Sequence, residues 1–426
     1  MSTISEELGG TGSGTIRLRP DTPGYIRDQL SLSPTAPSPR AGFGSIFITD
    51  GYRGPAPSFG TAQAGALWWG FLRDRADNGL ELSGPGSTWL LGDEDGKGRL
   101  SPPASGAPYP YVVGFVPPGN LFETMAGSPG TPTFWATAAA GSALLSVGTV
   151  GAAPAIPYFG YVARMDQEAP RRWLQLAADA FGFEWRVRPT GVLDMATPAE
   201  IYGTTTRLVV GSHLWPGAMP SESLICTTGN VVFSESLTEW VSRWNARTDT
   251  TTLGTATRTD PYQFWLGVLG SAPLGWGGYS EVSTTTGTGS TSTPAAMSAA
   301  RARTERDAHN HAAVLTVDVN SDAIPRIVPV GGTIGVWEPE HGIVGATPVN
   351  AMGQWIRPVS LRVLGAEWPI RSTSGVYVFP HMPNTPPIDL TDWVEWGDGP
   401  TRLTVGKLRL PTLSQALMRR AWNPAA

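Results

Sequence analysis

The chain has 426 residues, of which 41% are apolar, so it can fill several hydrophobic cores and is not a disordered polymer. Only 15% of its residues are charged and the net charge is −5, which argues against a protein whose main task is to grip nucleic acid. The 52 glycines and 39 prolines exclude a mainly helical protein. Short strands joined by many turns are expected instead.

The cysteine content and the first residues of the sequence argue against several further classes of protein. Cys226 is the only cysteine, which excludes a disulfide within the chain and a zinc site built from several of its cysteines. Residues 1–14 show no basic-then-apolar leader, and no apolar run reaches the roughly 18 residues of a membrane span. We therefore expect no membrane-spanning segment, and a protein that stays in the cell that makes it or leaves by lysis.

The first 160 residues predict an arm followed by a β domain. Residues 1–40 form an N-terminal arm or linker, with a flexible glycine stretch at Gly9–Gly14 and a strand at Thr15–Arg19. Residues 41–160 predict an antiparallel, β-barrel-like domain with long loops. Its strands are expected at Ser45–Thr49, Ala66–Leu72, Ser87–Leu91 and Tyr111–Val116.

The clearest local signal lies in an α+β module predicted over 161–225. A helix capped by Asp166, with Pro170 in its first turn, carries an apolar stripe and stops at Gly182. Strands at Phe183–Arg188 and Val192–Met195 follow, so the helix should pack on a small sheet. The side chains predicted to form the core here and in later strands are Trp173, Leu176, Phe181, Trp185, Trp337 and Trp368.

The rest of the chain predicts a second β-rich domain and a tail. Residues 226–400 contain strand patterns at Asn230–Ser234, Val314–Val319 and Gly332–Trp337, and two more between Arg357 and Phe379. The segment from Ser236 to Trp244 fits a short helix or a strand pair equally well. Residues 401–426 form a C-terminal docking tail. The predicted fold class is therefore α+β, predominantly β, with small antiparallel barrels and one helix-on-sheet module.

Candidate chemistry is weak throughout the chain. Ser212 and His213 are adjacent, so in a strand they would point to opposite faces and could not form a nucleophile–base pair. His309 and His311 have H-x-H spacing, but a third metal ligand would have to come from His341 or Glu338. The acidic stretch Asp93–Gly98 starts like a calcium loop, yet its twelfth position is Ala104. We predict no catalytic residue, metal or cofactor.

The 17 tryptophans are unusual and have two readings. They can form an aromatic groove for sugars, or they can supply buried area in cores and subunit interfaces. We favour packing, because several of them sit in strand patterns.

Two segments together resemble a known family. One runs from Arg172-Trp173-Leu174-Gln175 through Gly182-Phe183-Glu184-Trp185 to Gly191-Val192-Leu193-Asp194. The other begins at Val330-Gly331-Gly332-Thr333, continues through Ser360-Leu361-Arg362-Val363 and Glu367-Trp368-Pro369, and closes at Thr391-Asp392-Trp393. In order and spacing they resemble minor tail proteins of long-tailed phages that infect actinobacteria, which are similar to baseplate-hub or tail-associated proteins.

The resemblance implies a structural role in the virion, located at the tail tip. It implies a homotrimeric hub that continues the tail tube, contacts the distal tail protein, the tape-measure protein and other tip proteins, and lets DNA pass on ejection. Excess acidity suits such a channel, because carboxylates repel DNA phosphates. Two alternatives stay open: a tail-tip hydrolase that cuts the cell wall, and a receptor-binding or carbohydrate-binding tail protein.

Overall fold

The computed structural model describes residues 1–32, 44–51, 57–92, 111–113, 132–143, 145–152, 161–163, 169–181, 183–211, 222–225, 232–235, 243–247, 252–257, 281–285, 313–319, 323–337, 358–380 and 386–406. Strands dominate this part and helices are few, so the predicted α+β, predominantly β class is confirmed. No described helix is both long and apolar enough to cross a membrane.

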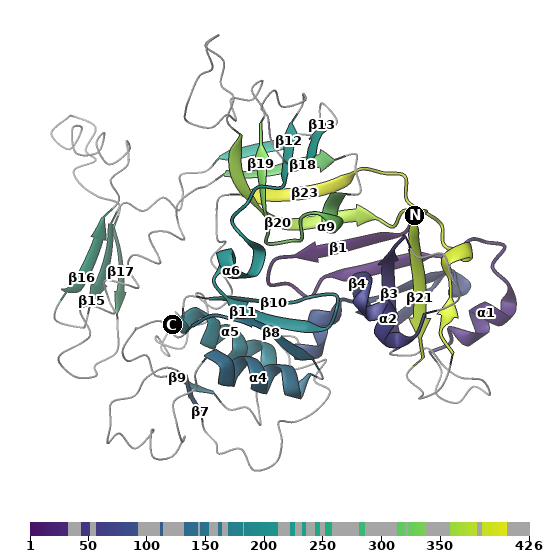
Figure 1. Ribbon diagram of the computed structural model, residues 1–426, viewed down its shortest axis with the longest axis horizontal. Coiled ribbons are helices and arrows are strands. Elements are labelled where there is room, and N and C mark those ends of the chain that lie inside the picture. The colour runs from purple at the N-terminus through teal and green to yellow at the C-terminus, as the bar shows by residue number, and fades with distance from the viewer. Residues whose placement is uncertain are drawn as a thin grey trace, which may run out of the picture.

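A branched sheet of eleven strands forms the centre of the molecule (Figure 1). Its long strand β20 (Val359–Pro369) pairs with two strands along one edge and with another strand along the other edge. The main path is β13 (Glu222–Ile225), β12 (Leu208–Gly211), β19 (Thr333–Val336), β20, β1 (Thr3–Glu7), β2 (Ser13–Arg17), β6 (Glu81–Pro85) and β5 (Asp74–Ala76). The branch from β20 is β23 (Thr401–Gly406), β18 (Ala313–Val319) and β14 (Val232–Glu235). The pairings among the described strands close no ring, so the expected barrels are open sheets here.

The remaining described strands form four smaller sheets. The first is β22 (Ile388–Asp389), β21 (Ser374–Phe379), β3 (Ser45–Asp50) and β4 (Ala66–Phe71). The second is β10 (Glu184–Val187), β11 (Val192–Ala196) and β8 (Ser146–Val150). The third is β16 (Thr252–Thr257), β15 (Arg243–Arg247) and β17 (Glu281–Thr285), and the fourth is β7 (Tyr111–Val113) with β9 (Tyr161–Ala163).

The sheet β22-β21-β3-β4 separates two hydrophobic cores. Side chains alternate along each strand, so Ile46 and Ile48 enter one core while Phe47 enters the other. The first core also takes the buried residues of the central sheet, and the second takes those of the helix-on-sheet module. Burial on both faces explains the nearly continuous apolar sequence of β3 and β4.

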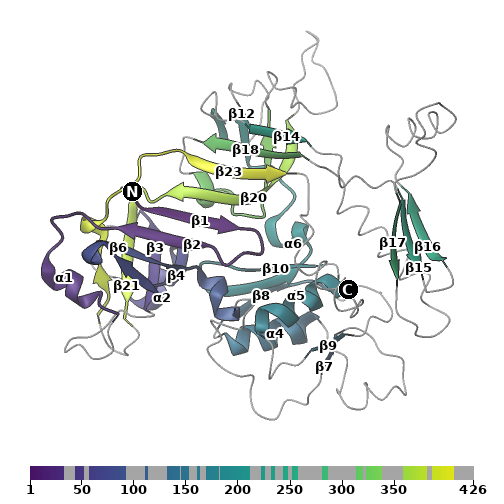
Figure 2. The ribbon, with the colours of Figure 1, turned by 180° about the vertical axis from the view of Figure 1, so that it is seen from behind.

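The helix-on-sheet module is confirmed and is larger than predicted. Helices α4 (Pro132–Ser142) and α5 (Pro170–Phe181) cover one face of the sheet β10-β11-β8, as both views show (Figure 2). Helix α5 begins at Pro170, three residues later than a cap at Asp166 implies, and Asp166 lies outside the described residues; β10 and β11 form the predicted hairpin. The strand β8 pairs with β11 in parallel, so the antiparallel domain expected over 41–160 is wrong at this strand.

Two further expectations need correction. Ser87–Leu91 is a 3-10 helix rather than a strand, with the amide of Trp89 bonded to the carbonyl of Gly86. Leu90 and Leu91 are both buried, which a half-buried strand does not allow for neighbouring residues. The arm expected over 1–40 contains β1 and β2 of the central sheet; residues 8–12 supply the turn between them, and Gly14 lies in β2. The domain boundaries themselves remain predictions.

The other helices are short. Helix α6 (Pro198–Tyr202) has a capping box, in which Thr197 and Glu200 each bond the other's backbone amide. Among the described residues, the remaining helices are α1 (Gly24–Gln29), α2 (Phe59–Ala64) and α9 (Ala323–Arg326), with 3-10 turns at Asp77–Gly79 and Thr391–Trp393. The Asp77–Gly79 turn has positive φ at all three residues, which Asn, Asp and Gly tolerate best.

Candidate functional site

The residues considered for catalysis or metal binding lie outside the described part of the chain. These are Ser212, His213, His309, His311, His341, Glu338 and the stretch from Asp93 to Gly98. Among the residues that the structure describes, no three histidine, cysteine, aspartate or glutamate side chains are grouped so that they could hold a metal ion. The described residues therefore direct attention to a different site.

That site is the junction between the helix-on-sheet module and the central sheet. Glu184 in β10 and Arg362 in β20 form a two-pronged ion pair, with both nitrogen–oxygen distances at 2.6 Å. Both side chains are about 15% exposed, and Arg362 also donates through Nε to the carbonyl oxygen of Gly331. Glu184 and Arg362 belong to the two separate segments that carry the family resemblance, so the fold brings these segments into direct contact.

Tyr202, at the end of α6, lies between two arginines of this junction. The guanidinium carbon of Arg186 is 4.6 Å from the centre of the Tyr202 ring, and that of Arg362 is 5.4 Å away. Burial and the nearby Glu184 raise the pKa of Tyr202 to about 12, so the ring stays neutral at physiological pH. A neutral ring that contacts two arginines joins α6, β10 and β20.

Gly331 leaves the space that the Tyr202 ring occupies beside the two arginines. Its φ is +93°, and a Cβ atom there would lie 2.3 Å from the Tyr202 ring. We expect Gly331→Ala to destabilise the protein by about 2–4 kcal/mol, because it combines backbone strain with a clash against a confined ring. Gly203 is the matched control: its φ is +77° but no atom lies within 4 Å of its would-be Cβ. Gly203→Ala should cost about 1–3 kcal/mol in urea denaturation, less than Gly331→Ala, because its backbone (ψ 173°) strains an alanine without any clash. Equal losses would contradict this account.

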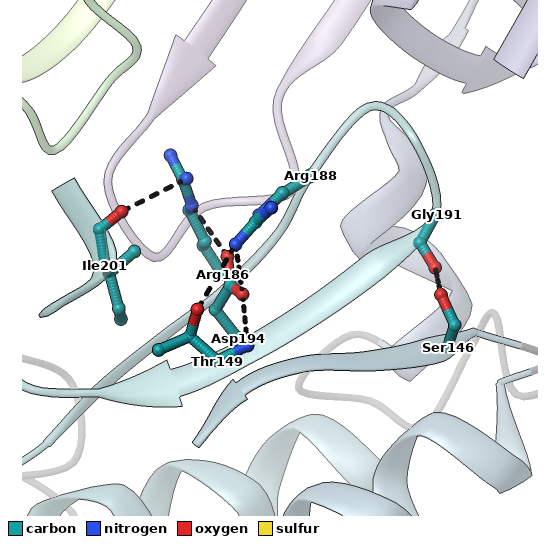
Figure 3. A network of polar contacts seen from close by, with 7 residues as sticks. All are labelled: Ser146, Thr149, Arg186, Arg188, Gly191, Asp194 and Ile201. Atoms are coloured by element: carbon teal, nitrogen blue, oxygen red, sulfur yellow. Dashed lines mark hydrogen bonds and ion pairs between the residues drawn. The ribbon is translucent and has the colours of Figure 1, made fainter. Parts of the chain in front are cut away.

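A second polar network lies on the sheet face opposite the helices (Figure 3). The buried carboxylate of Asp194 binds Arg188 through two contacts of 2.6 and 2.7 Å and Arg186 through one of 3.2 Å. The backbone amide of Thr149 also donates to it, at 2.8 Å. Gly148 leaves room for this carboxylate, since a Cβ there would lie 2.4 Å from Asp194 Oδ1. The network ties β8, β10 and β11 together.

A cavity of about 420 Å³ separates the module from the β1–β2 hairpin. Its titratable lining residues are Glu6, Glu7, Arg186, Arg188, Tyr202 and Arg326. Glu6 accepts a hydrogen bond from the Trp368 indole at 3.3 Å. Burial raises the pKa of Glu6 to about 7, although the indole and the positive charge of Arg186 both oppose the shift. The Glu6 carboxyl is therefore poised to lose its proton near neutral pH.

Glu6 gives the protein a pH-dependent stability. Folding raises the pKa of Glu6 from 4.5 to about 7, so the folded protein binds this proton more tightly than the unfolded chain. The resulting gain in folding free energy is complete below pH 4.5 and is lost as the pH rises through 7. We expect Glu6→Gln to be more stable than the wild type by about 3 kcal/mol at pH 8.5, where Glu6 is charged. At pH 4.5 the folded wild type keeps Glu6 neutral, so ionisation of this group should add almost no difference in stability between the two proteins. Urea denaturation across this range measures the difference. Glu7→Gln, at the exposed neighbour in the same strand, should not reproduce the pH dependence.

The described tryptophans are packed inside the protein. Trp185 and Trp368, both predicted for the core, are 4% and 3% exposed, and Trp337 is half-buried. The side chains of Trp173, Leu176 and Phe181 lie outside the described part. Trp68, Trp69 and Trp135 are also no more than 5% exposed. These five buried rings cannot stack on a sugar from solvent.

Comparison with known proteins gives structural similarities only. No protein-family model and no curated protein matches the chain. The 43 kDa tail protein of prophage MuSo2 from Shewanella oneidensis is 11% identical with a TM-score of 0.49, over 95% of this chain and 93% of that chain. The tail protein from Neisseria meningitidis MC58 is 12% identical with a TM-score of 0.44, over 95% of each chain. Prophage tail protein gp18 from Listeria monocytogenes EGD-e is 8% identical with a TM-score of 0.44, over 98% of this chain and 92% of that chain.

Sequence reasoning missed the charged face of the module. The alternation Glu184, Arg186, Arg188 in β10 and its continuation was a readable signal, because every second residue of a strand faces the same side. Three charges on one face of a small sheet predict charged partners. Asp194 lies opposite Arg186 in the next strand of the same hairpin, whereas Arg362 comes from the central sheet and could not be assigned without the fold.

Proposed function

We propose that this protein is a structural component of a phage virion that forms the tail-tip, or baseplate, hub. The observation that carries the proposal is the junction described above. Two segments that resemble minor tail proteins are far apart in sequence, yet Glu184 of one and Arg362 of the other bind each other at 2.6 Å. A shared buried contact is a reason for such segments to occur together.

The way the described charged and aromatic residues are used supports a structural role. One buried ion pair fixes the module to the central sheet, another ties the strands of the module's own sheet together, and five described tryptophans are buried in the cores. In our proposal three copies form a ring that continues the tail tube and lets DNA pass on ejection. The ring contacts the distal tail protein, the tape-measure protein and other tip proteins.

Imaging of particles tests this proposal directly. Virions from a lysate are purified, and the protein is located by cryo-electron microscopy and by gold-labelled antibody. We expect three copies in a ring at the end of the tail tube. Absence of the protein from purified particles, or a single copy away from the tail axis, would overturn the proposal.

A biochemical assay addresses the two other tail-tip functions. The purified chain is incubated with isolated cell wall, and release of soluble fragments and retention on the wall are both measured. The hub proposal expects neither activity. Fragment release would indicate a hydrolase, and saturable retention that free sugars displace would indicate a receptor-binding protein.

A further inference from the structure

Asp194 holds Arg186 less firmly than it holds Arg188. Arg186 contacts Asp194 Oδ2 at 3.2 Å and donates to the carbonyl oxygen of Ile201 at 3.4 Å (Figure 3). Arg188 covers both oxygens of the same carboxylate at 2.6 and 2.7 Å, and the Thr149 amide adds a third bond. Asp194 therefore keeps three close donors if Arg186 moves away.

A second carboxyl group competes for Arg186 from the other side of the cavity. Glu6, on β1, lines the same cavity as Arg186, and the charge of Arg186 acts on the Glu6 carboxyl. Its one hydrogen bond in the described structure comes from the Trp368 indole at 3.3 Å. The other charged groups facing the cavity are Glu7 from the same strand, Arg188 after β10 and Arg326 of α9. Of the carboxyl groups, Glu6 is the one whose pKa is raised to about 7.

Tyr202 provides a surface on which the guanidinium of Arg186 can shift. The ring lies 4.6 Å from the Arg186 guanidinium carbon and also lines the cavity. Because the contact acts on the face of a neutral ring, it does not fix which carboxylate the guanidinium binds. Arg186 can then exchange partners without losing this contact.

We propose that Arg186 is a proton-controlled switch between Asp194 and Glu6. When Glu6 gives its proton to solvent, the new carboxylate draws Arg186 across the cavity and links β10 to the β1–β2 hairpin. When Glu6 is protonated, Arg186 stays with Asp194 and the link is open. This inference concerns the isolated chain and holds whether or not the protein is a tail-tip hub.

A double-mutant cycle with Glu6→Gln and Arg186→Gln tests the switch. Unfolding equilibrium constants of the wild type, both single variants and the double variant are measured in urea at pH 5.5 and 8.5. We expect the coupling between the two sites to be about tenfold at pH 8.5 and less than about twofold at pH 5.5. The matched cycle with Glu7→Gln should show no coupling at either pH. Equal coupling at both values, or none at pH 8.5, would overturn the proposal.

A titration by carbon-13 NMR gives an independent readout. The side-chain carboxyl resonance of Glu6, assigned with Glu6→Gln, should titrate near pH 7 in the wild type, and its midpoint should rise in Arg186→Gln because a neighbouring cation is lost. A midpoint near 4.5, or one that Arg186→Gln leaves unchanged, would count against the switch. If Arg186→Gln does not fold, Arg186→Lys replaces it, with a smaller rise expected because the charge is kept.

Discussion

Replacing Asp194 by alanine is expected to cost about 3–5 kcal/mol of folding free energy. The carboxylate is fully buried and is shared by Arg186 and Arg188. Its loss leaves two guanidinium groups close together without their counter-ion, and the Thr149 amide loses its acceptor. Chemical denaturation, followed by far-ultraviolet circular dichroism, measures the change.

Two further variants separate charge from shape at this position. Asp194→Asn keeps an acceptor for the Thr149 amide, so it should cost less than the alanine variant, about 1–3 kcal/mol. Asp21→Ala removes a carboxylate that also binds an arginine, Arg19, at 2.5 Å, but both of these side chains are exposed. That surface control should change stability by less than about 1 kcal/mol. A loss at Asp194 no larger than that at Asp21 would show that the network contributes little.

Arg362→Ala is expected to destabilise the protein by about 3 kcal/mol or more. It leaves the half-buried Glu184 carboxylate without its partner and removes the bond to the Gly331 carbonyl. Because Glu184 belongs to the module and Arg362 to the central sheet, we also expect easier proteolysis between these two parts. Urea denaturation and limited chymotrypsin digestion, which cuts after aromatic residues and so keeps the same cleavage sites in every variant, measure the two effects.

Arg402 supplies the matched control for this prediction. It faces Glu367 at 3.9 Å from the neighbouring strand, but these side chains are 63% and 51% exposed. Solvent screens such a pair, so Arg402→Ala should change stability by about 0–1 kcal/mol and leave the digestion pattern unchanged. If Arg362→Ala behaves like Arg402→Ala, the junction does not hold the module in place.

Elements with a strong local pattern could be predicted from the sequence. The helix from Pro170 to Phe181 carries its apolar stripe at helical spacing, and the hairpin after it alternates large apolar with charged residues. Both patterns lie within about twelve residues, so they can be read without knowing which distant segments pack against them. Strand β3 was recovered for a similar reason, as a short apolar run bounded by turn residues.

Elements that depend on distant partners could not be predicted in this way. Helix α4 is rich in alanine and buried against α5 and β8, so its sequence shows no polar face to mark a period. Strand β1 is five residues long with one fully buried side chain, Ile4, and the partner that places it in the middle of the central sheet, β20, is distant in the sequence. The ion pair of Glu184 with Arg362 likewise exists only once the two sheets meet.

The place of β1 in the central sheet has a consequence for how the protein is made. Thr3 pairs with Pro369 and Glu7 with Gly365, so β1 leaves the ribosome long before β20 and stays without this neighbour until synthesis has passed Pro369. Loop closure over such a separation slows acquisition of the native state. During synthesis the nascent chain therefore exposes an unpaired strand edge, and a chaperone that shields such edges should raise the yield of native protein.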